Sequence, residues 1–149
     1  EVARSFRGLP HRCEFVRNLN GVDYINDSKG TNVGATVAAI ESLVPDSGKV
    51  ILIAGGDGKG ADFQPLAEPV AACCRALVLI GRDAGKISEA VGVSVPQYRA
   101  TSLQEAVSLA RQAAEPGDRV LLSPACASFD MFRDYNDRGE QFRALVEGL

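Results

Sequence analysis

The chain has 149 residues, of which 46% are hydrophobic and 23% charged, and its 16 basic and 19 acidic residues give a formal charge of −3. This composition predicts one folded domain rather than a disordered chain. The acidic excess argues against nucleic-acid binding, which needs a surplus of Lys and Arg to neutralise phosphates. No apolar run approaches the ~20 residues that span a bilayer, and no signal-peptide pattern is present, so we expect a cytoplasmic protein with no membrane partner.

The cysteines give no sign of a disulfide framework or a metal site. Cys73 and Cys74 are adjacent, Cys13 and Cys126 are distant, and no CxxC pair occurs. We therefore expect reduced thiols and no bound metal. The chain begins at Glu1 rather than Met, and we expect it to be part of a longer protein.

The N-terminal third predicts a hairpin followed by a helix. Strands are expected at residues 13–17 and 21–26, because they are joined by an Asn-Gly pair, which is typical of a tight hairpin turn. From residue 33 to 44, branched apolar residues recur at helical spacing. Thr31 or Asn32 would provide the N-cap of this helix.

The rest of the chain alternates between strand and helix patterns. Further strands are expected at residues 49–54, 76–80, 95–99 and 119–122. Further helices are expected at residues 65–74 and 84–91, from a capping box at 102–105 onwards, and at 137–146. This order predicts an α/β fold: a doubly wound, mostly parallel, Rossmann-like sheet of about six strands, with an antiparallel N-terminal hairpin and helices on both faces.

A polar segment at residues 26–32 follows the second expected strand. Ligands of open α/β sheets bind beyond the carboxyl ends of the strands, and a helix N-terminus favours anions. Lys29 and Thr31 are therefore candidates for binding a phosphate or a carboxylate, and Asp27 for ribose hydroxyls or a metal. The alternative is that these residues only cap the helix.

A glycine-rich segment, GGDGKG, follows the third expected strand. It is not a Walker A loop, because Lys59 is followed by glycine rather than Ser or Thr. Gly56, Gly58 and Ala61 fit G-x-G-x-x-G/A loosely, which allows a dinucleotide-binding module, although only Asp83 matches the expected acidic residue. A flexible turn with a solvated lysine is a third interpretation.

The segment SPACAS follows the last expected strand. A nucleophilic Cys126 is disfavoured, because His11, the one histidine, precedes the first strand. Ser128 and the neighbouring backbone amides are better candidates for holding an anion. Phe129 and Tyr135 flank this position, although a role in the core is also expected for them.

Four segments together resemble the C-terminal domain of the Mur ligases, in the branch of the family that adds D-glutamate. These segments are GLPHR at 8–12, NDSKGTN at 26–32, GGDGK at 55–59 and SPACAS at 123–128. The resemblance covers nearly the whole chain and implies an ATP-dependent amide ligase of peptidoglycan biosynthesis, acting with Mg²⁺ on UDP-N-acetylmuramoyl-L-alanine and D-glutamate. Residues 1–149 would then be one domain of a monomer that binds D-glutamate, closes over ATP and is inactive alone. The N-terminal UDP-binding domain and the central ATPase domain, with the catalytic residues and most of the contacts to ATP and Mg²⁺, would be absent.

The resemblance also implies residue roles. ATP would be contacted by Arg12, Asp27 and Lys29. D-glutamate would be bound by Thr31, Lys59, Ser128, Phe129 and Tyr135. Supporting positions would be His11, Asn32 and Asp57. The chain departs from the family pattern at Gly30, where alanine is common, at Gly60, and at Tyr135, where phenylalanine is frequent. A non-catalytic dinucleotide-binding module remains the alternative.

Overall fold

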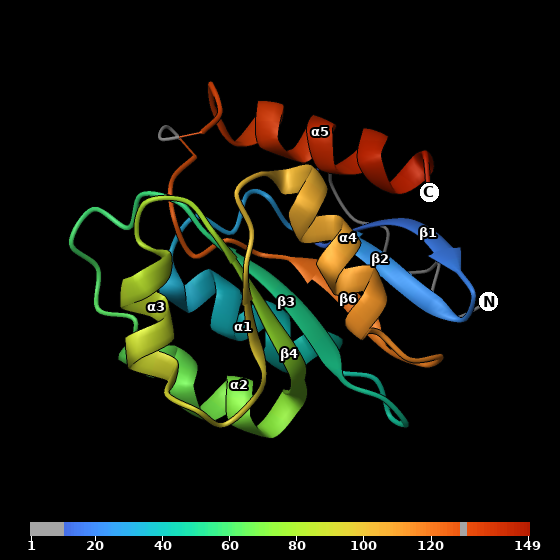
Figure 1. The fold of residues 1–149 in the computed structure, drawn as a ribbon, viewed down its shortest axis with the longest axis horizontal. Coiled ribbons are helices and arrows are strands. Elements are labelled where there is room, and N and C mark those ends of the chain that lie inside the picture. Colours follow the sequence, from blue (N-terminus) through green and yellow to red (C-terminus); the bar gives the residue numbers. More distant parts are fainter. Residues whose placement is uncertain (1–10, 129–130) are drawn as a thin grey trace.

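The computed structural model describes residues 11–128 and 131–149 (Figure 1). Their six strands form one sheet in the order β1-β2-β6-β3-β4-β5. The strands are β1 (Glu14–Leu19), β2 (Val22–Asn26), β3 (Val50–Gly55), β4 (Cys74–Ile80), β5 (Gln97–Arg99) and β6 (Arg119–Leu122). The helices are α1 (Val33–Leu43), the 3₁₀ helix η2 (Gln64–Leu66), α2 (Ala67–Cys73), α3 (Ala84–Val91), α4 (Leu103–Ala113) and α5 (Tyr135–Glu147).

The N-terminal hairpin is antiparallel, as the sequence predicts. β1 pairs with β2, and the turn residues Asn20 and Gly21 have φ values of 56° and 83°. Two consecutive left-handed residues are what a two-residue type I′ hairpin requires, and Asn-Gly is the sequence that best tolerates them. The remaining neighbours, from β2 to β5, pair in parallel.

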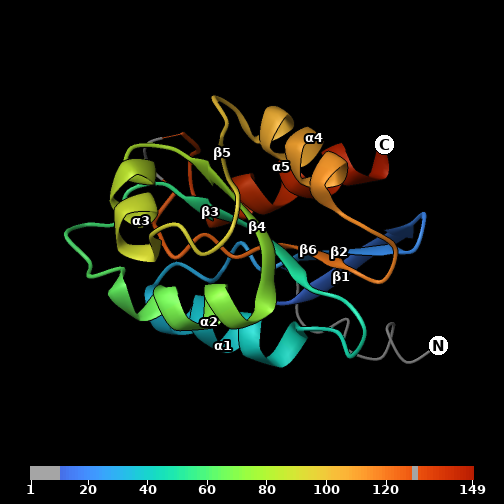
Figure 2. The same ribbon diagram turned by 60° about the horizontal axis from the view of Figure 1, so that its bottom comes forward.

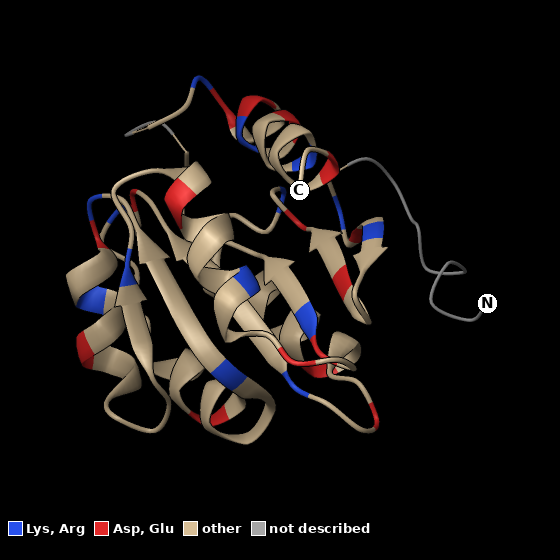
Figure 3. Cartoon of the chain, turned by 45° about the vertical axis from the view of Figure 1, so that its right-hand side comes forward, with Lys and Arg blue, Asp and Glu red and all other residues tan. Residues whose placement is uncertain are grey.

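Helices cover both faces of the sheet and create two apolar layers (Figure 2). Apolar residues of α1, α2 and α3 pack on one face, where Leu52 of β3 lies. Those of α4 and α5 pack on the other face, where Ile51 lies. Figure 3 shows the central strands almost without charged residues, and every residue of β3 is buried. The predicted doubly wound fold is confirmed.

The order of the strands determines where a ligand site can form. From β2 the chain crosses past the position of β6 to β3, continues outward to β4 and β5, and returns to insert β6 between β2 and β3. The carboxyl ends of β2, β6 and β3 are therefore neighbours. In open α/β sheets a ligand crevice forms at such a switch point.

Two predicted helices differ from those observed. The expected helix at 65–74 is divided into η2, with Pro65 in its first turn, and α2. The last helix begins at Tyr135 rather than 137, because the side chain of Asp134 caps it by accepting the Asp137 N–H at 2.8 Å. The periodicity of apolar residues could not reveal this polar first turn.

A buried carboxylate organises the opposite end of the sheet. Asp118, just before β6, accepts the backbone N–H of Lys49 at 2.9 Å and that of Glu115 at 2.8 Å. Arg75 of β4 donates Nε to it at 2.6 Å. Burial raises the pKa of Asp118, but the hydrogen bonds from Arg75 and the two amides outweigh burial and hold the pKa below its ordinary value.

We expect Asp118→Asn to lower the free energy of unfolding at pH 7 by about 2 kcal/mol, because a charge-assisted network loses its anion. Because the pKa of Asp118 is lower in the folded state, the carboxylate stabilises the fold fully at pH values above its unfolded-state pKa, near 3.8. This stabilisation is lost as the pH falls through the folded-state pKa. Urea unfolding at pH 7 and pH 3 measures this. The difference between wild type and variant should shrink at pH 3, and an unchanged difference would contradict the assignment.

Candidate functional site

Three loops meet at the carboxyl edge of the sheet. They are the β2–α1 loop (27–32), the β3–η2 loop (56–63) and the β6–α5 loop (123–134, described except for 129 and 130). Ala125 donates its N–H to the carbonyl of Gly30 at 2.9 Å. Asp57 and Ala127 exchange backbone hydrogen bonds of 3.0 and 2.9 Å. The loops that the sequence singled out therefore form one continuous backbone assembly.

A larger cavity of about 500 Å³ lies between the β2–α1 loop and α1. Its polar wall contains all three residues that the resemblance assigns to ATP, namely Arg12, Asp27 and Lys29. Its apolar wall is formed by small residues of one face of α1, namely Ala35, Ala38, Ala39 and Ser42. The larger cavity thus combines two cations with a flat, weakly polar surface.

A smaller cavity of about 320 Å³ lies beside it, lined by Thr31, Lys59, Ala127, Ser128, Asp134 and Tyr135. Four of the five residues expected to bind D-glutamate meet here. The fifth, Phe129, lies outside the described residues. Thr31 and Tyr135 line both cavities, and the Lys29 ammonium lies 5.7 Å from the Tyr135 ring centre. The residues assigned to ATP therefore line the larger cavity alone, whereas the D-glutamate group lines the smaller cavity and shares two members with the larger one.

Asp27 is held in the wall of the larger cavity. Its carboxylate accepts the N–H of Cys13 at 3.1 Å and the hydroxyl of Ser123 at 2.7 Å. Burial raises the pKa of Asp27, and these hydrogen bonds oppose the increase. Burial and the neighbouring Asp27 raise the pKa of the Cys13 thiol to about 11. Cys13 is therefore a neutral thiol at the cavity wall.

Arg12 is presented to the cavity by an unusual backbone. Its neighbours His11 and Cys13 have φ values of 62° and 47°, which side-chain-bearing residues rarely adopt. Each neighbour is tied to the β2–α1 loop: the carbonyl of His11 accepts the Lys29 N–H at 2.9 Å, and Cys13 contacts Asp27. The strained conformation is thus fixed by surrounding contacts.

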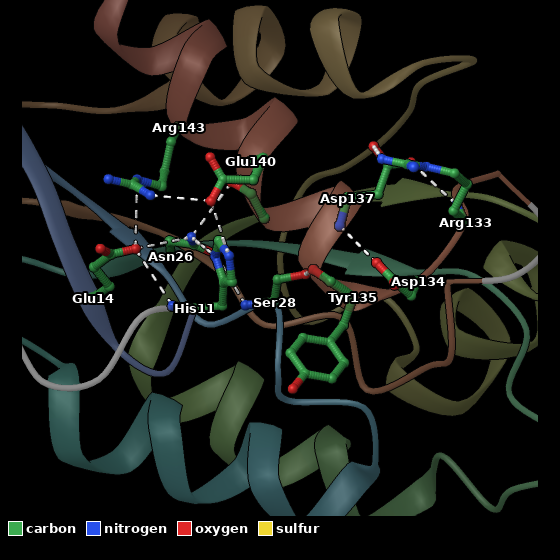
Figure 4. Close-up of polar contacts among 11 residues, drawn as sticks. His11, Glu14, Asn26, Ser28, Arg133, Asp134, Tyr135, Asp137, Glu140 and Arg143 are labelled. Carbon is green, nitrogen blue, oxygen red and sulfur yellow. Dashed lines mark hydrogen bonds and ion pairs between the residues drawn. The ribbon is translucent and has the colours of Figure 1, made fainter.

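His11 lies behind the larger cavity rather than in its wall. Its ring is buried, with Nδ1 2.8 Å from Nδ2 of Asn26 and Nε2 3.2 Å from Glu140 (Figure 4). The Asn26 oxygen accepts the Ser28 N–H at 3.1 Å, so Nδ2 is the group that faces His11. Because Nδ2 can only donate, His11 accepts at Nδ1. A Cβ at Gly139 would lie 2.3 Å from this nitrogen, so the close approach of α5 requires glycine.

The other two supporting residues each hold a backbone amide. Asn32 is the N-cap of α1 and accepts the Ala35 N–H at 2.9 Å. Asp57 accepts the Lys59 N–H at 3.0 Å. In the same loop, Gly58 donates its N–H to Asp83 at 2.7 Å.

These contacts do not favour the dinucleotide-binding interpretation. In that motif, free amides of the glycine loop and the helix that follows it hold a pyrophosphate. Here the amides of Gly58 and Lys59 are occupied by carboxylates, and the next helix, η2, begins only at Gln64. Asp83, the acidic residue that would bind the ribose, is one of these two acceptors.

Arg138 of α5 is an organising residue that the sequence analysis missed. Its side chain is fully buried and donates to Ser28 Oγ at 2.9 Å, to the Ser28 carbonyl at 2.7 Å and to the Cys126 carbonyl at 3.1 Å. Ser28 Oγ in turn donates to the Tyr135 carbonyl at 2.7 Å. In the sequence, Arg138 belongs to a polar helix with several charged residues, so no pattern distinguished it. Cys126 is buried beside it, in agreement with the expected small-residue turn.

The part of the chain that the structure describes has neither a membrane-spanning helix nor a metal-ligand cluster. None of its helices has the length and apolar character needed to cross a membrane. Nor do its His, Cys, Asp and Glu residues form a group of three that could hold a metal ion.

The family model described as "Mur ligase, glutamate ligase domain" matches residues 11–126. The chain belongs to the Mur ligase family. It is 95% identical over 149 residues to the UDP-N-acetylmuramoylalanine–D-glutamate ligase of Marinobacter nauticus, covering 100% of this chain and 33% of that protein. The Pseudomonas fluorescens ligase of the same name is 64% identical over 147 residues, covering 98% and 33%. This Mur ligase chain therefore spans about a third of the curated relatives it matches.

Solved structures with low sequence identity share the fold. The MurF ligase of Thermotoga maritima in complex with ADP matches with a TM-score of 0.66 at 17% identity, covering 97% of this chain and 33% of that one. The FolC protein of E. coli in complex with ADP also matches with a TM-score of 0.66 at 17% identity, covering 94% and 32%. The predicted fold class and Mur ligase membership are both confirmed.

We expect Arg138→Met to lower the free energy of unfolding by about 3 kcal/mol, because buried oxygens that accept from the guanidinium lose their donor. The matched control is Arg133→Met, since the Arg133 side chain is 87% exposed and forms an exposed ion pair of 3.6 Å with Asp137. The control should change stability by less than about 0.5 kcal/mol. Urea denaturation of both variants provides the measurement, and equal effects would contradict the role of Arg138.

Proposed function

We propose that this chain is the amino-acid-binding C-terminal domain of a UDP-N-acetylmuramoylalanine–D-glutamate ligase. The observation that carries the proposal is the pair of adjoining cavities, one lined by the residues matched to ATP and the other by residues matched to D-glutamate. The Marinobacter nauticus ligase supports it at 95% identity over all 149 residues.

The chemistry of the larger cavity fits one side of a nucleoside triphosphate. Arg12 and Lys29 would neutralise phosphate oxygens, since phosphate recognition relies on such cations. Asp27 would accept from the ribose hydroxyls, and its contacts with Cys13 and Ser123 fix its orientation. The small residues of α1 leave room for the flat parts of the nucleotide.

The chemistry of the smaller cavity fits a dicarboxylate. Lys59 and Thr31 would bind the α-carboxylate of D-glutamate. Ser128 and the backbone around Phe129 would hold the side-chain carboxylate, with Tyr135 nearby. Two separate groups of anion-binding residues in one cavity would suit a ligand with two carboxylates.

In the proposed reaction, ATP with Mg²⁺ phosphorylates the alanyl carboxylate of UDP-N-acetylmuramoyl-L-alanine, and the amine of D-glutamate attacks the acyl phosphate to form the amide. The residues of this chain contribute by holding the amino acid and one side of the nucleotide so that the reacting groups meet. The phosphate loop and the metal-binding residues would belong to a central domain outside this sequence. Intracellular ATP and a UDP-sugar substrate would place the ligase in the bacterial cytoplasm.

We expect the purified 149-residue chain to fold, to bind D-glutamate and ATP weakly, and to show neither ligase nor ATPase activity, because one side of each site is missing. An NMR titration tests the binding. D-glutamate should shift the amide signals of Thr31, Lys59 and Ser128. Turnover by the isolated chain would refute this expectation, and NAD shifts confined to residues 56–61 would support a dinucleotide-binding module instead.

In the full-length ligase, we expect Lys59→Ala to raise the KM for D-glutamate about tenfold or more, because a carboxylate loses a charge-assisted contact. The KM for ATP should change little, since Lys59 lines the smaller cavity and not the larger one. Steady-state kinetics with each substrate varied in turn measures both constants. An equal loss for the two substrates would count against the assigned role.

A further inference from the structure

The side-chain carboxylates of Asp57 and Asp83 hold the backbone around Lys59. The N–H of Gly58 donates to Oδ2 of Asp83 at 2.7 Å, and the N–H of Lys59 donates to Oδ1 of Asp57 at 3.0 Å. Lys59 itself has a φ of 52°, a left-handed conformation that costs free energy for a residue with a side chain. The two hydrogen bonds to Asp57 and Asp83 are the contacts that offset this cost.

Asp83 holds the loop at two points. It lies at the start of α3 with only 7% of its surface exposed, and its own N–H donates to the carbonyl of Gly56 at 3.0 Å. Its other carboxylate oxygen forms an ion pair of 3.7 Å with Lys86, whose side chain is 68% exposed. The buried contact with Gly58 and the exposed contact with Lys86 can therefore be removed separately.

Asp57 connects the same loop to the part of the β6–α5 loop that lines the smaller cavity. Its backbone pairs with Ala127 in both directions, and Ala127 precedes Ser128. The two loop segments that carry Lys59 and Ser128 are thus joined by backbone hydrogen bonds. Asp83 fixes the segment that carries the lysine.

We propose that Asp83 is a positioning residue for Lys59, and that it determines the affinity of the ligase for the amino-acid substrate without touching it. The inference rests on the proposed role of Lys59 in binding a carboxylate of D-glutamate. Without an acceptor for the Gly58 N–H, the loop relaxes from the left-handed conformation and the Lys59 ammonium leaves the smaller cavity. Asp83 lines neither cavity, so the contacts to the nucleotide stay intact.

The test uses three variants of the full-length ligase. Asp83→Ala should raise the KM for D-glutamate about tenfold, with the KM for ATP and the kcat at saturating D-glutamate within about twofold of wild type. Asp83→Asn retains an oxygen that accepts the Gly58 N–H. Its KM for D-glutamate should therefore lie between those of the wild type and Asp83→Ala. Lys86→Ala removes only the exposed ion pair and should leave the KM for D-glutamate and the KM for ATP unchanged.

A double-mutant cycle with Lys59→Ala separates positioning from a general loss of structure. Once Lys59 is absent, Asp83→Ala should have no further effect on the KM for D-glutamate. Equal effects of Asp83→Ala with and without Lys59, or a parallel rise in the KM for ATP, would overturn the inference. If circular dichroism shows that Asp83→Ala does not fold, Asp83→Asn replaces it in the double-mutant cycle with Lys59→Ala.

The cycle also separates this inference from the proposed function. If Lys59→Ala leaves the KM for D-glutamate unchanged, the role of Lys59 itself is wrong. If Lys59→Ala raises this KM while Asp83→Ala does not, the binding role stands and the positioning role of Asp83 is refuted.

Discussion

The arrangement of both cavities depends on the buried guanidinium of Arg138. A charge removed from water is tolerated where hydrogen bonds compensate it, and each of the three nitrogens of Arg138 donates a hydrogen bond, two to Ser28 on one loop and one to Cys126 on another. The guanidinium is planar and rigid, so its acceptors must occupy fixed relative positions. Packing of Phe142 and Val146 against the sheet fixes α5 and therefore the arginine. Apolar packing on one face of the sheet thus determines the shape of a polar site at its edge.

The formal charge of −3 conceals a small local excess of cations, since three basic and two acidic side chains line the two adjoining cavities. Arg12, Lys29 and Lys59 lie in the walls of the two adjoining cavities. α1, whose N-cap is the neutral Asn32, has no acidic residue in its first turn, so the partial positive charge of its N-terminus is not neutralised there. α5 differs, since Asp134 caps it and Asp137 lies in its first turn. The loop edge of the sheet combines side-chain and backbone contributions that attract anions.

The sequence was sufficient to predict the fold because the buried strands carry unalternating apolar runs and the hairpin carries Asn-Gly. It also identified the three loops, since the carboxyl ends of parallel strands lie at one edge. It did not identify Arg138 or Asp83 as residues that hold these loops. Arg138 looks like any charged residue of a polar helix, and the hydrogen bond of Asp83 to Gly58 joins residues 25 positions apart. Such contacts arise from the packing of the elements rather than from local pattern.

Thr31 and Tyr135 are walls of both cavities, which has a thermodynamic consequence. A ligand that orders these two side chains reduces the conformational entropy that a second ligand must remove. Whatever free energy is transmitted this way acts equally in both directions, because coupling between two binding equilibria is reciprocal. Under the proposed function, the shared wall would make the nucleotide and D-glutamate effectors of each other, with no movement of the sheet beneath them required.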